Sequence, residues 1–346
     1  MNFKGIILVI ASLFFIVSCS VENDSVMNDV NAEMTAGTIE YASLTFNVGL
    51  GTSTKSATAN GTEEGTAAET SISNCIMIIT KGNATSSKIT AITNVTGSNL
   101  VYNSDNTWSI NANMVVKATN DLYVTVITNV DYSTFASCST LGEVQTKKVG
   151  LNTESLVKCS SAVAIGEIPS QYKSAHTTDL IPYTIPTISL TQLAAKVELV
   201  AFNVAYTGET GTNMEEPAVS LESTNLVNAK TTSCLYMQDS DATLASLADQ
   251  NLDSSAKFSC YTFQNNDASN QTALQLTVKV GNIMKTKTYT VKTPNGTSYD
   301  EIVKAGYVYR VTVNLIVNRI SKEFDVTLHY EAVPFDQVTV NVPSFD

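Results

Sequence analysis

The amino-acid sequence predicts an all-β protein of the β-sandwich type. Almost every periodic segment alternates apolar and polar residues at period two, which is typical of strands with one buried face. Charged residues make up only 15% of the chain, against about 25% in ordinary globular domains, and Thr, Ser and Asn take their place. Short strands separated by Gly, Asn and Pro turns are typical of sandwiches. The 346 residues suffice for two domains at roughly 100–200 residues each.

The strands are expected along the whole chain after its first 40 residues. They are predicted at 42–50, 72–80, 122–130, 273–280, 285–292, 307–318, 324–330 and 337–342. Residues 188–204 are expected to begin with a helical turn and to continue as a strand. Residues 51–71 have no apolar periodicity and are predicted to form a long exposed loop. Pro169, Pro182 and Pro186 interrupt the pattern, so we place one domain at 41–186 and the second at 187–346.

The first and last predicted strands share one pattern. The first puts Leu44, Phe46, Val48 and Leu50 on one face, and the last alternates Val338, Val340 and Val342 with polar residues. The last strand has no partner after it in the chain. Either it closes its own domain, or its apolar face enters another copy of the protein.

The N-terminus has the features of an export signal. Residues 1–18 carry one basic residue, Lys4, followed by an apolar stretch too short to span a membrane. The stretch ends at Ser18-Cys19, which resembles a bacterial lipobox, where the signal is cut before a cysteine that is then lipidated. The alternative is an ordinary signal peptide with a chance cysteine. Residues 19–40 are acidic and polar and are predicted to be a tether.

The remaining cysteines suggest neither a metal site nor a fixed disulfide pattern. Cys75 lies in an apolar run and is expected to be a small core residue. Cys138 with Cys159, and Cys234 with Cys260, are possible disulfides in an exported protein. No two of these cysteines have the CxxC spacing of a zinc site.

The sequence gives no indication of catalysis, a cofactor or nucleic-acid binding. The formal net charge is −12, whereas phosphate binding needs clustered Lys and Arg. His176 and His329 are the only histidines and lie in no zinc pattern. There is no nucleophile elbow, Walker loop or dinucleotide fingerprint. Trp108, the only tryptophan, is expected in the core or on a strand surface. We therefore expect no enzyme, no cofactor and no metal.

Several stretches, taken in order, resemble the FimA-type fimbrillins, lipoprotein pilins of Bacteroidales. The lipobox comes first, then LTFNV with a TKSAT loop, and IGEIP at 165–169. SLTQLAAKVEL at 189–199 resembles the opening of the second fimbrillin domain. KFSCYTFQNN, TALQLTVKV, AGYVYRVTVNL and FDVTLHYEAVPFDQ continue the resemblance. Gln192 and Phe335 depart from it, where a basic residue and a Trp are common.

The resemblance implies two transthyretin-like sandwiches and a mode of assembly. A lipoprotein precursor, held at the outer membrane by lipid such as palmitate on Cys19, is trimmed by a trypsin-like surface protease and polymerises by strand exchange. On this reading the N-terminal strand fills a groove in its own domain until cleavage frees it. The donor strand of the next subunit, with Val338, Val340, Val342 and Phe345, then enters by β-augmentation.

The cleavage site follows from the basic residues. Arg310 and Arg319 are the only arginines, so an Arg-specific protease cannot cut near the N-terminus. Lys55 lies just after the first strand, and cutting there would free that strand alone. Lys81 is the next choice, but cutting there would also remove the strand at 72–80.

The sequence therefore predicts a structural pilin in a cell-surface fimbrium for adhesion. Its partners would be copies of itself and other fimbrial subunits. A tip or anchor subunit, or a monomeric glycan-binding surface lipoprotein, is the alternative, and a hydrolase is the weakest interpretation.

Overall fold

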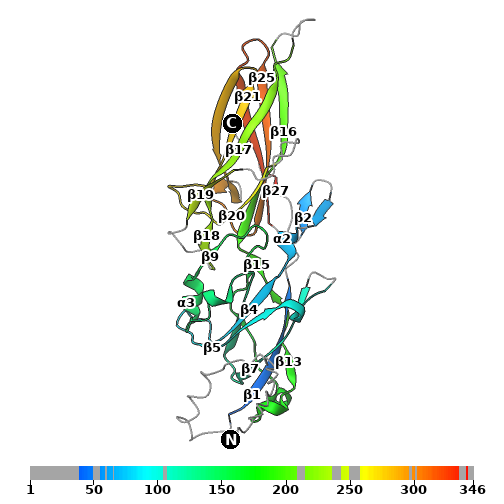
Figure 1. Ribbon diagram of the computed structural model, residues 1–346, viewed down its shortest axis with the longest axis vertical. Coiled ribbons are helices and arrows are strands. Elements are labelled where there is room, and N and C mark those ends of the chain that lie inside the picture. Colours follow the sequence, from blue (N-terminus) through cyan, green and yellow to red (C-terminus); the bar gives the residue numbers. More distant parts are fainter. Residues whose placement is uncertain are drawn as a thin grey trace, which may run out of the picture. The chain divides into compact units, whose positions relative to one another are not determined.

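The protein is nearly all β-structure, as the sequence predicts (Figure 1). The computed structural model describes residues 39–49, 55–58, 61–64, 66–103, 107–208, 215–235, 243–248, 258–295, 298–300, 302–334 and 340–341. Within these ranges, no helix has both the length and the apolar character needed to cross a membrane.

Two sheets built from residues 41–192 form the first half. The first sheet has the order β12-β1-β7-β6, with β13 and β14 also paired to β1. Its strands are β1 (Tyr41–Gly49), β6 (Leu100–Tyr102), β7 (Thr107–Lys117), β12 (Lys173–Ser174), β13 (Pro182–Thr184) and β14 (Ile188–Ser189). The second sheet has the order β15-β10-β8-β4-β5, with β11 also paired to β8. Its strands are β4 (Asn74–Lys81), β5 (Ile89–Thr96), β8 (Leu122–Thr128), β10 (Lys158–Cys159), β11 (Val163–Ala164) and β15 (Thr191–Gln192).

These two sheets enclose one apolar core. Alternate residues of β1 and β7 meet alternate residues of β4 and β8, including Leu44, Met77, Ile110 and Val126. The sandwich arises because each strand presents one apolar face, which must be buried against another sheet.

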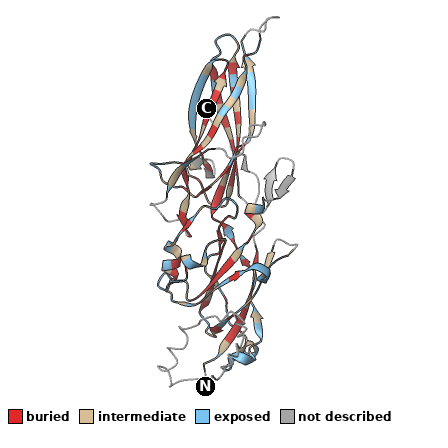
Figure 2. Ribbon diagram, viewed as in Figure 1, coloured by how far each residue is buried: buried red, intermediate tan, exposed pale blue. Residues whose placement is uncertain are grey.

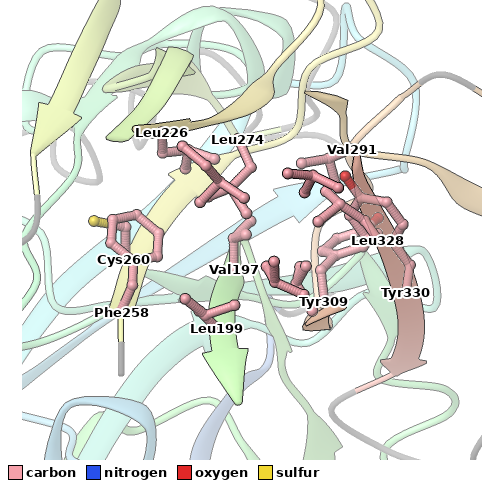
Figure 3. Close-up of a cluster of buried hydrophobic side chains, with 14 of the residues drawn as sticks. Val197, Leu199, Leu226, Phe258, Cys260, Leu274, Val291, Tyr309, Leu328 and Tyr330 are labelled. Atoms are coloured by element: carbon pink, nitrogen blue, oxygen red, sulfur yellow. The ribbon is translucent and has the colours of Figure 1, made fainter. Parts of the chain in front are cut away.

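A single nine-stranded sheet forms the second half. Its order is β22-β21-β17-β20-β16-β25-β26-β27, with β19 also paired to β17. Its strands are β16 (Ala194–Thr207), β17 (Val219–Lys230), β19 (Leu244–Ala248), β20 (Phe258–Phe263), β21 (Ala273–Val280), β22 (Ile283–Thr290), β25 (Tyr307–Asn318), β26 (Phe324–Pro334) and β27 (Val340–Asn341). The buried faces of these strands gather into one core that includes Val197, Leu226, Leu274, Tyr309 and Leu328 (Figure 3). Figure 2 shows the buried residues alternating along these strands.

Short elements complete the fold. Three small two-stranded sheets pair β2 with β3, β9 with β18, and β23 with β24. Their strands are β2 (Lys55–Thr58), β3 (Gly61–Glu64), β9 (Lys148–Gly150), β18 (Thr232–Cys234), β23 (Thr293–Asn295) and β24 (Ser298–Asp300). The helices of the described part of the chain are α2 (Ala67–Thr70) and α3 (Leu141–Thr146), with 3₁₀ turns η1 (Gly97–Asn99), η2 (Tyr132–Thr134), η3 (Ser170–Tyr172) and η4 (Thr177–Asp179). A third cluster of buried side chains joins residues of both halves, among them Ile127, Leu193, Leu235 and Phe263.

The predicted strands that the structure describes lie close to where the alternation places them, with two corrections. Of the strand predicted at 337–342, only residues 340–341 are described. The helical turn expected at the start of 188–204 is wrong, because residues 188–189 and 191–192 form β14 and β15 in the sheets of the first half. The long exposed loop expected at 51–71 is also wrong, because it contains β2, β3 and α2. Sheet membership changes between Gln192 and Ala194, and the domain boundary at 186–187 stays a prediction.

Candidate functional site

The first strand, β1, lies inside its sheet and is paired on both sides (Figure 1). It runs antiparallel to β7, with Phe46 opposite Ile110 and Val48 opposite Trp108. On its other side it runs parallel to β13 and β14, and antiparallel to β12. A strand held in this way leaves an open groove between two backbones if it is withdrawn, with hydrogen-bonding groups free on each side.

The inner face of β1 is a large part of the first core. Ala42, Leu44 and Val48 are 0% exposed and Phe46 is 1% exposed. Full burial of Leu44, Phe46 and Val48 stabilises the fold by about 5–9 kcal/mol as an upper estimate. Leu50, the fourth residue predicted for this face, lies outside the described residues.

The outer face of β1 is polar and lines a shallow pocket. The Thr45 and Thr184 hydroxyls are hydrogen-bonded at 2.8 Å. Asn47 lies opposite Ser109 of β7, and the register between β1 and β7 shifts between Leu44 and Phe46. At this shift a pocket of about 450 Å³ is lined mostly by uncharged polar side chains. β1 therefore has one apolar face and one face of hydroxyl and amide side chains.

Lys55, the predicted cleavage site, begins a small hairpin. In this hairpin β2 pairs antiparallel with β3, and Lys55 is opposite Glu64. The two strands form a sheet of their own. An isolated two-stranded hairpin is at best marginally stable in water, so local opening would expose this backbone to a protease.

The segment after the hairpin is fixed by a buried carboxylate that sequence reasoning missed. Glu69 of α2 is 6% exposed. Its Oε2 accepts the backbone N–H of Thr66 at 2.8 Å, and its Oε1 accepts the Tyr261 hydroxyl of β20 at 2.7 Å. Lys196 Nζ of β16 lies 3.4 Å from Glu69 Oε1. These contacts tie α2 to the sheet of the second half.

The network continues to two more charges of the second half. Lys196 Nζ lies 3.1 Å from Glu198 Oε2, and Arg310 Nε donates to Glu198 Oε1 at 3.0 Å. Burial alone would lower the pKa of Lys196, but Glu198 and Glu69 outweigh it, so that pKa is raised. Burial and then the Glu69 carboxylate raise the pKa of Tyr261. Lys196 therefore stays charged and Tyr261 stays a hydroxyl donor at neutral pH.

A second buried group holds the chain between α2 and β4. Lys158 Nζ donates to the carbonyls of Ser71 and Leu156, each at 3.2 Å. Asn129 Nδ2 donates to the same two oxygens at 2.9 and 2.8 Å. Burial lowers the pKa of Lys158 to about 8. The chain from residue 66 onward is therefore anchored on both halves of the protein.

The C-terminal strand, β27, pairs with β26 of its own chain. In β27, Val340 pairs with Ala332 and Asn341 with Glu331 of β26. These are the described pairings of the predicted donor strand, and they lie at an end of the nine-stranded sheet of its own chain. Val338, Val342 and Phe345 lie outside the described residues.

The five cysteines of the described residues form no disulfide with one another. Cys75, Cys159, Cys234 and Cys260 are buried, and Cys138 is partly buried. Neither of the two open pairings, Cys138 with Cys159 or Cys234 with Cys260, is formed. Cys75 is 0% exposed, as expected of a small core residue, and burial raises its pKa to about 12. Cys19 lies outside the described residues, so its lipidation stays a prediction.

Other side chains singled out in the sequence are placed as follows. Trp108 is partly buried against the first core, and its ring lies 5.4 Å from that of Tyr102. Among the described residues, no group of three or more His, Cys, Asp or Glu is arranged to hold a metal ion.

Comparison with known proteins places the fold. No family model matches the chain, and no curated protein matches its sequence. A proposed cell adhesion protein from Parabacteroides distasonis is similar in structure, with a TM-score of 0.62 and 18% identity over 86% of this chain and 98% of that one. The tip fimbrial protein Mfa3 from Porphyromonas gingivalis, with a C-terminal truncation, gives 0.52 and 11% over 85% and 99%. The fimbrilin FimA from the same species gives 0.50 and 11% over 84% and 96%.

These similarities span nearly the full length of each solved structure. At identities of 11–18% they establish a shared fold. The all-β fimbrillin fold implied by the sequence resemblance is confirmed.

Proposed function

We propose that this chain is a structural subunit of a cell-surface fimbrium that serves adhesion. The observation that carries the proposal is the fold, which this chain shares over most of its length with a fimbrilin and a tip fimbrial protein. Neither the sequence nor the described residues offer a catalytic constellation that would favour an enzyme. The precursor would be exported by the signal at 1–18 and held at the outer membrane by lipid on Cys19.

Assembly would begin when a trypsin-like protease cuts after Lys55. The marginal hairpin β2–β3 supports this site, because its backbone opens more easily than a core strand. Lys81, the alternative, ends β4, whose pairs with β5 and β8 cover both of its edges. Its backbone N–H also donates to the Lys88 carbonyl at 3.0 Å. A protease would have to open the paired end of β4 to bind this backbone.

Withdrawal of the cut β1 would open the groove between β7 and β13. The C-terminal strand of another subunit would then leave its pairing with β26 and fill the groove by β-augmentation. Val338, Val340 and Val342 would replace the inner face of β1, and burying them would stabilise the contact by about 5–9 kcal/mol as an upper estimate. Phe345 lies an odd number of residues after Val342, so it would share that face only through a bulge.

Such a contact is heterologous and does not close, so it builds a filament. An internal subunit needs both a groove that opens and a donor strand to give. This chain has candidates for both, which favours a shaft subunit over a tip or anchor, since a terminal subunit uses only one of them.

The test uses filaments sheared from the source cells. Gel electrophoresis in SDS without boiling should show a ladder that collapses to one band after boiling. N-terminal sequencing of that band should begin at Ser56. Lys55→Ala should block processing and leave the precursor, whereas Lys81→Ala should not. A lone monomer in both lanes, or a mature form that still begins at Cys19, would contradict the proposal.

A further inference from the structure

The C-terminal segment repeats both faces of β1, and not only its apolar one. Residues 44–48 read Leu-Thr-Phe-Asn-Val, and residues 338–342 read Val-Thr-Val-Asn-Val. Alternation alone would require apolar residues at every second position. It does not require Thr and Asn, in the same order, at the two positions between them. The Thr and Asn between the apolar positions therefore need a separate explanation.

The structure gives the two polar residues of β1 specific neighbours. Thr45 is the parallel partner of Thr184 in β13, and their hydroxyls lie 2.8 Å apart. Asn47 is the antiparallel partner of Ser109 in β7. Both line the polar pocket at the register shift, together with Asn111 and Asn113. A strand with other residues at these positions would leave those amides and hydroxyls without the side chains that now face them.

We infer that the donor strand from a second copy of this chain enters the groove in the direction and register of β1, with Thr339 in the place of Thr45 and Asn341 in the place of Asn47. This inference rests on the proposed function and adds to it the polar residues that determine the register. Thr339 then bonds Thr184, and Asn341 lies beside Ser109. Val338, Val340 and Val342 take the places of Leu44, Phe46 and Val48.

This register also places a charge at one end of the groove. Two residues before Val338, Asp336 falls in the place of Ala42, which is 0% exposed and whose partner in β12 is Lys173. A carboxylate buried there is costly unless it is paired, so the register requires Asp336 to pair with Lys173. Residues directly opposite on neighbouring strands share a face, and opposite charges there stabilise the pair. A strand entering in the reverse direction, with Val340 again in the place of Phe46, would bring Asn341 to Thr184. It would also take Asp336 to the far end of the groove, away from Lys173.

The test is a disulfide between subunits, because a disulfide forms only when two residues are close. Paired residues of neighbouring strands are roughly 4.8 Å apart, within the range of about 4.4–6.8 Å between the Cα atoms of a disulfide. The full chain carrying Thr184→Cys and Thr339→Cys is processed with a Lys-specific protease, allowed to polymerise and oxidised. Boiled in SDS without reductant, it should give a ladder that reductant collapses.

The matched control places the second cysteine two residues further along the donor strand, at Asn341. Thr184→Cys with Asn341→Cys should give no ladder, and neither should Thr184→Cys alone, which controls for the native thiols. A ladder from the Asn341→Cys pair in place of the Thr339→Cys pair would overturn the inference, because it reports the reverse direction or a register shifted by two residues.

Removal of residues 336–346 separates failure of the inference from failure of the proposed function. If that truncation abolishes polymers and the Thr339→Cys pair still gives no ladder, strand exchange stands and the register is wrong. If the truncated chain polymerises like the full chain, the donor strand itself is wrong, and the inference falls with it.

Discussion

The two ends of the described chain carry similar strands in different surroundings. β1 is paired on both edges and its inner face is almost fully buried. β27, as far as the structure describes it, pairs with β26 at an end of its sheet. Among the described residues, the same pattern thus lies once inside a sheet with partners on both edges and once at the end of a sheet. The comparison shows that alternation alone does not determine where a strand lies in a sheet.

The comparison also gives a physical reason why the proposed assembly would require cleavage first. Leu44 and Phe46 are larger than Val338 and Val340, so in the inferred register β1 fills the groove more completely than the donor does. Because packing losses cost free energy, the donor would not displace an intact β1. In the proposed assembly, cutting the chain after β1 would turn an intramolecular strand into a separable peptide, and only then would the donor compete.

The largest expected effect is a loss of folding stability when β1 is altered in the uncut precursor. Phe46→Ala should lower the free energy of unfolding by about 3–5 kcal/mol, because it leaves a cavity in the first core. Val115→Ala, at an exposed position of β7, should cost less than about 1 kcal/mol. Denaturant unfolding of both variants checks this. Equal effects would mean that β1 is not the core strand described above.

The next effect concerns the anchor that follows β1. Glu69→Gln keeps the shape of the side chain but removes the charge that faces Lys196, and it should cost about 2–3 kcal/mol. Glu167→Gln, at an exposed position, is the control and should be neutral. Hydrogen exchange should also show faster opening of residues 66–71 in Glu69→Gln alone. Unchanged hydrogen exchange at residues 66–71 would show that Glu69 does not anchor this segment.

A pH effect tests the second anchor. The pKa of Lys158 is about 8 in the folded chain, against an ordinary value of 10.5. Below pH 8 both states hold the proton, so the cost of burying the charge is fully present. Above pH 8 only the unfolded chain keeps it, so stability should rise by about 1–2 kcal/mol between pH 8 and 9.5 from this group.

Lys158→Met should remove that rise, whereas Lys88→Met, at an exposed position, should keep it. The measurement is the free energy of unfolding at each pH, taken for the two variants and for the unaltered chain. A rise that persists in Lys158→Met would assign it to another group.

The smallest expected effect is on the contact between subunits and comes from changing Val340 in the C-terminal strand. Val340→Phe should restore the side chain that Phe46 supplies in the precursor. It should strengthen the contact between subunits by about 1–2 kcal/mol and raise the temperature at which unboiled polymers dissociate in SDS. Val340→Ala should lower that temperature. A lower dissociation temperature for Val340→Phe together with a higher one for Val340→Ala would indicate that Val340 does not enter the space left by Phe46.

The strands could be predicted from the sequence because their signal is local. Leu44, Phe46 and Val48 alternate within one short window, and the same holds for β21 and β25. β15 could not be predicted in this way, because Thr191 and Gln192 are strand residues only through their pairing with β10. The hairpin at Lys55 has no apolar face and so gave no periodic signal.

The anchoring residues could not be predicted because their partners are distant in sequence. Glu69 contacts Tyr261 and Lys196, and Lys158 bonds Ser71. A local feature around Glu69, the Thr66–Glu69 capping box, fits the pattern of Thr followed three residues later by Glu. It could have indicated a helix start, but not a buried charge.

The central claim is that the C-terminal strand fills the place that β1 leaves. The most direct measurement is the binding of a synthetic peptide of residues 335–346 to the chain that lacks residues 336–346 and has been cut after Lys55. The account predicts saturable binding of one peptide per chain, lost when Val338 and Val340 in the peptide are replaced by Asp, and absent with the uncut chain. Equal binding to cut and uncut chains, or no binding to either, would contradict it.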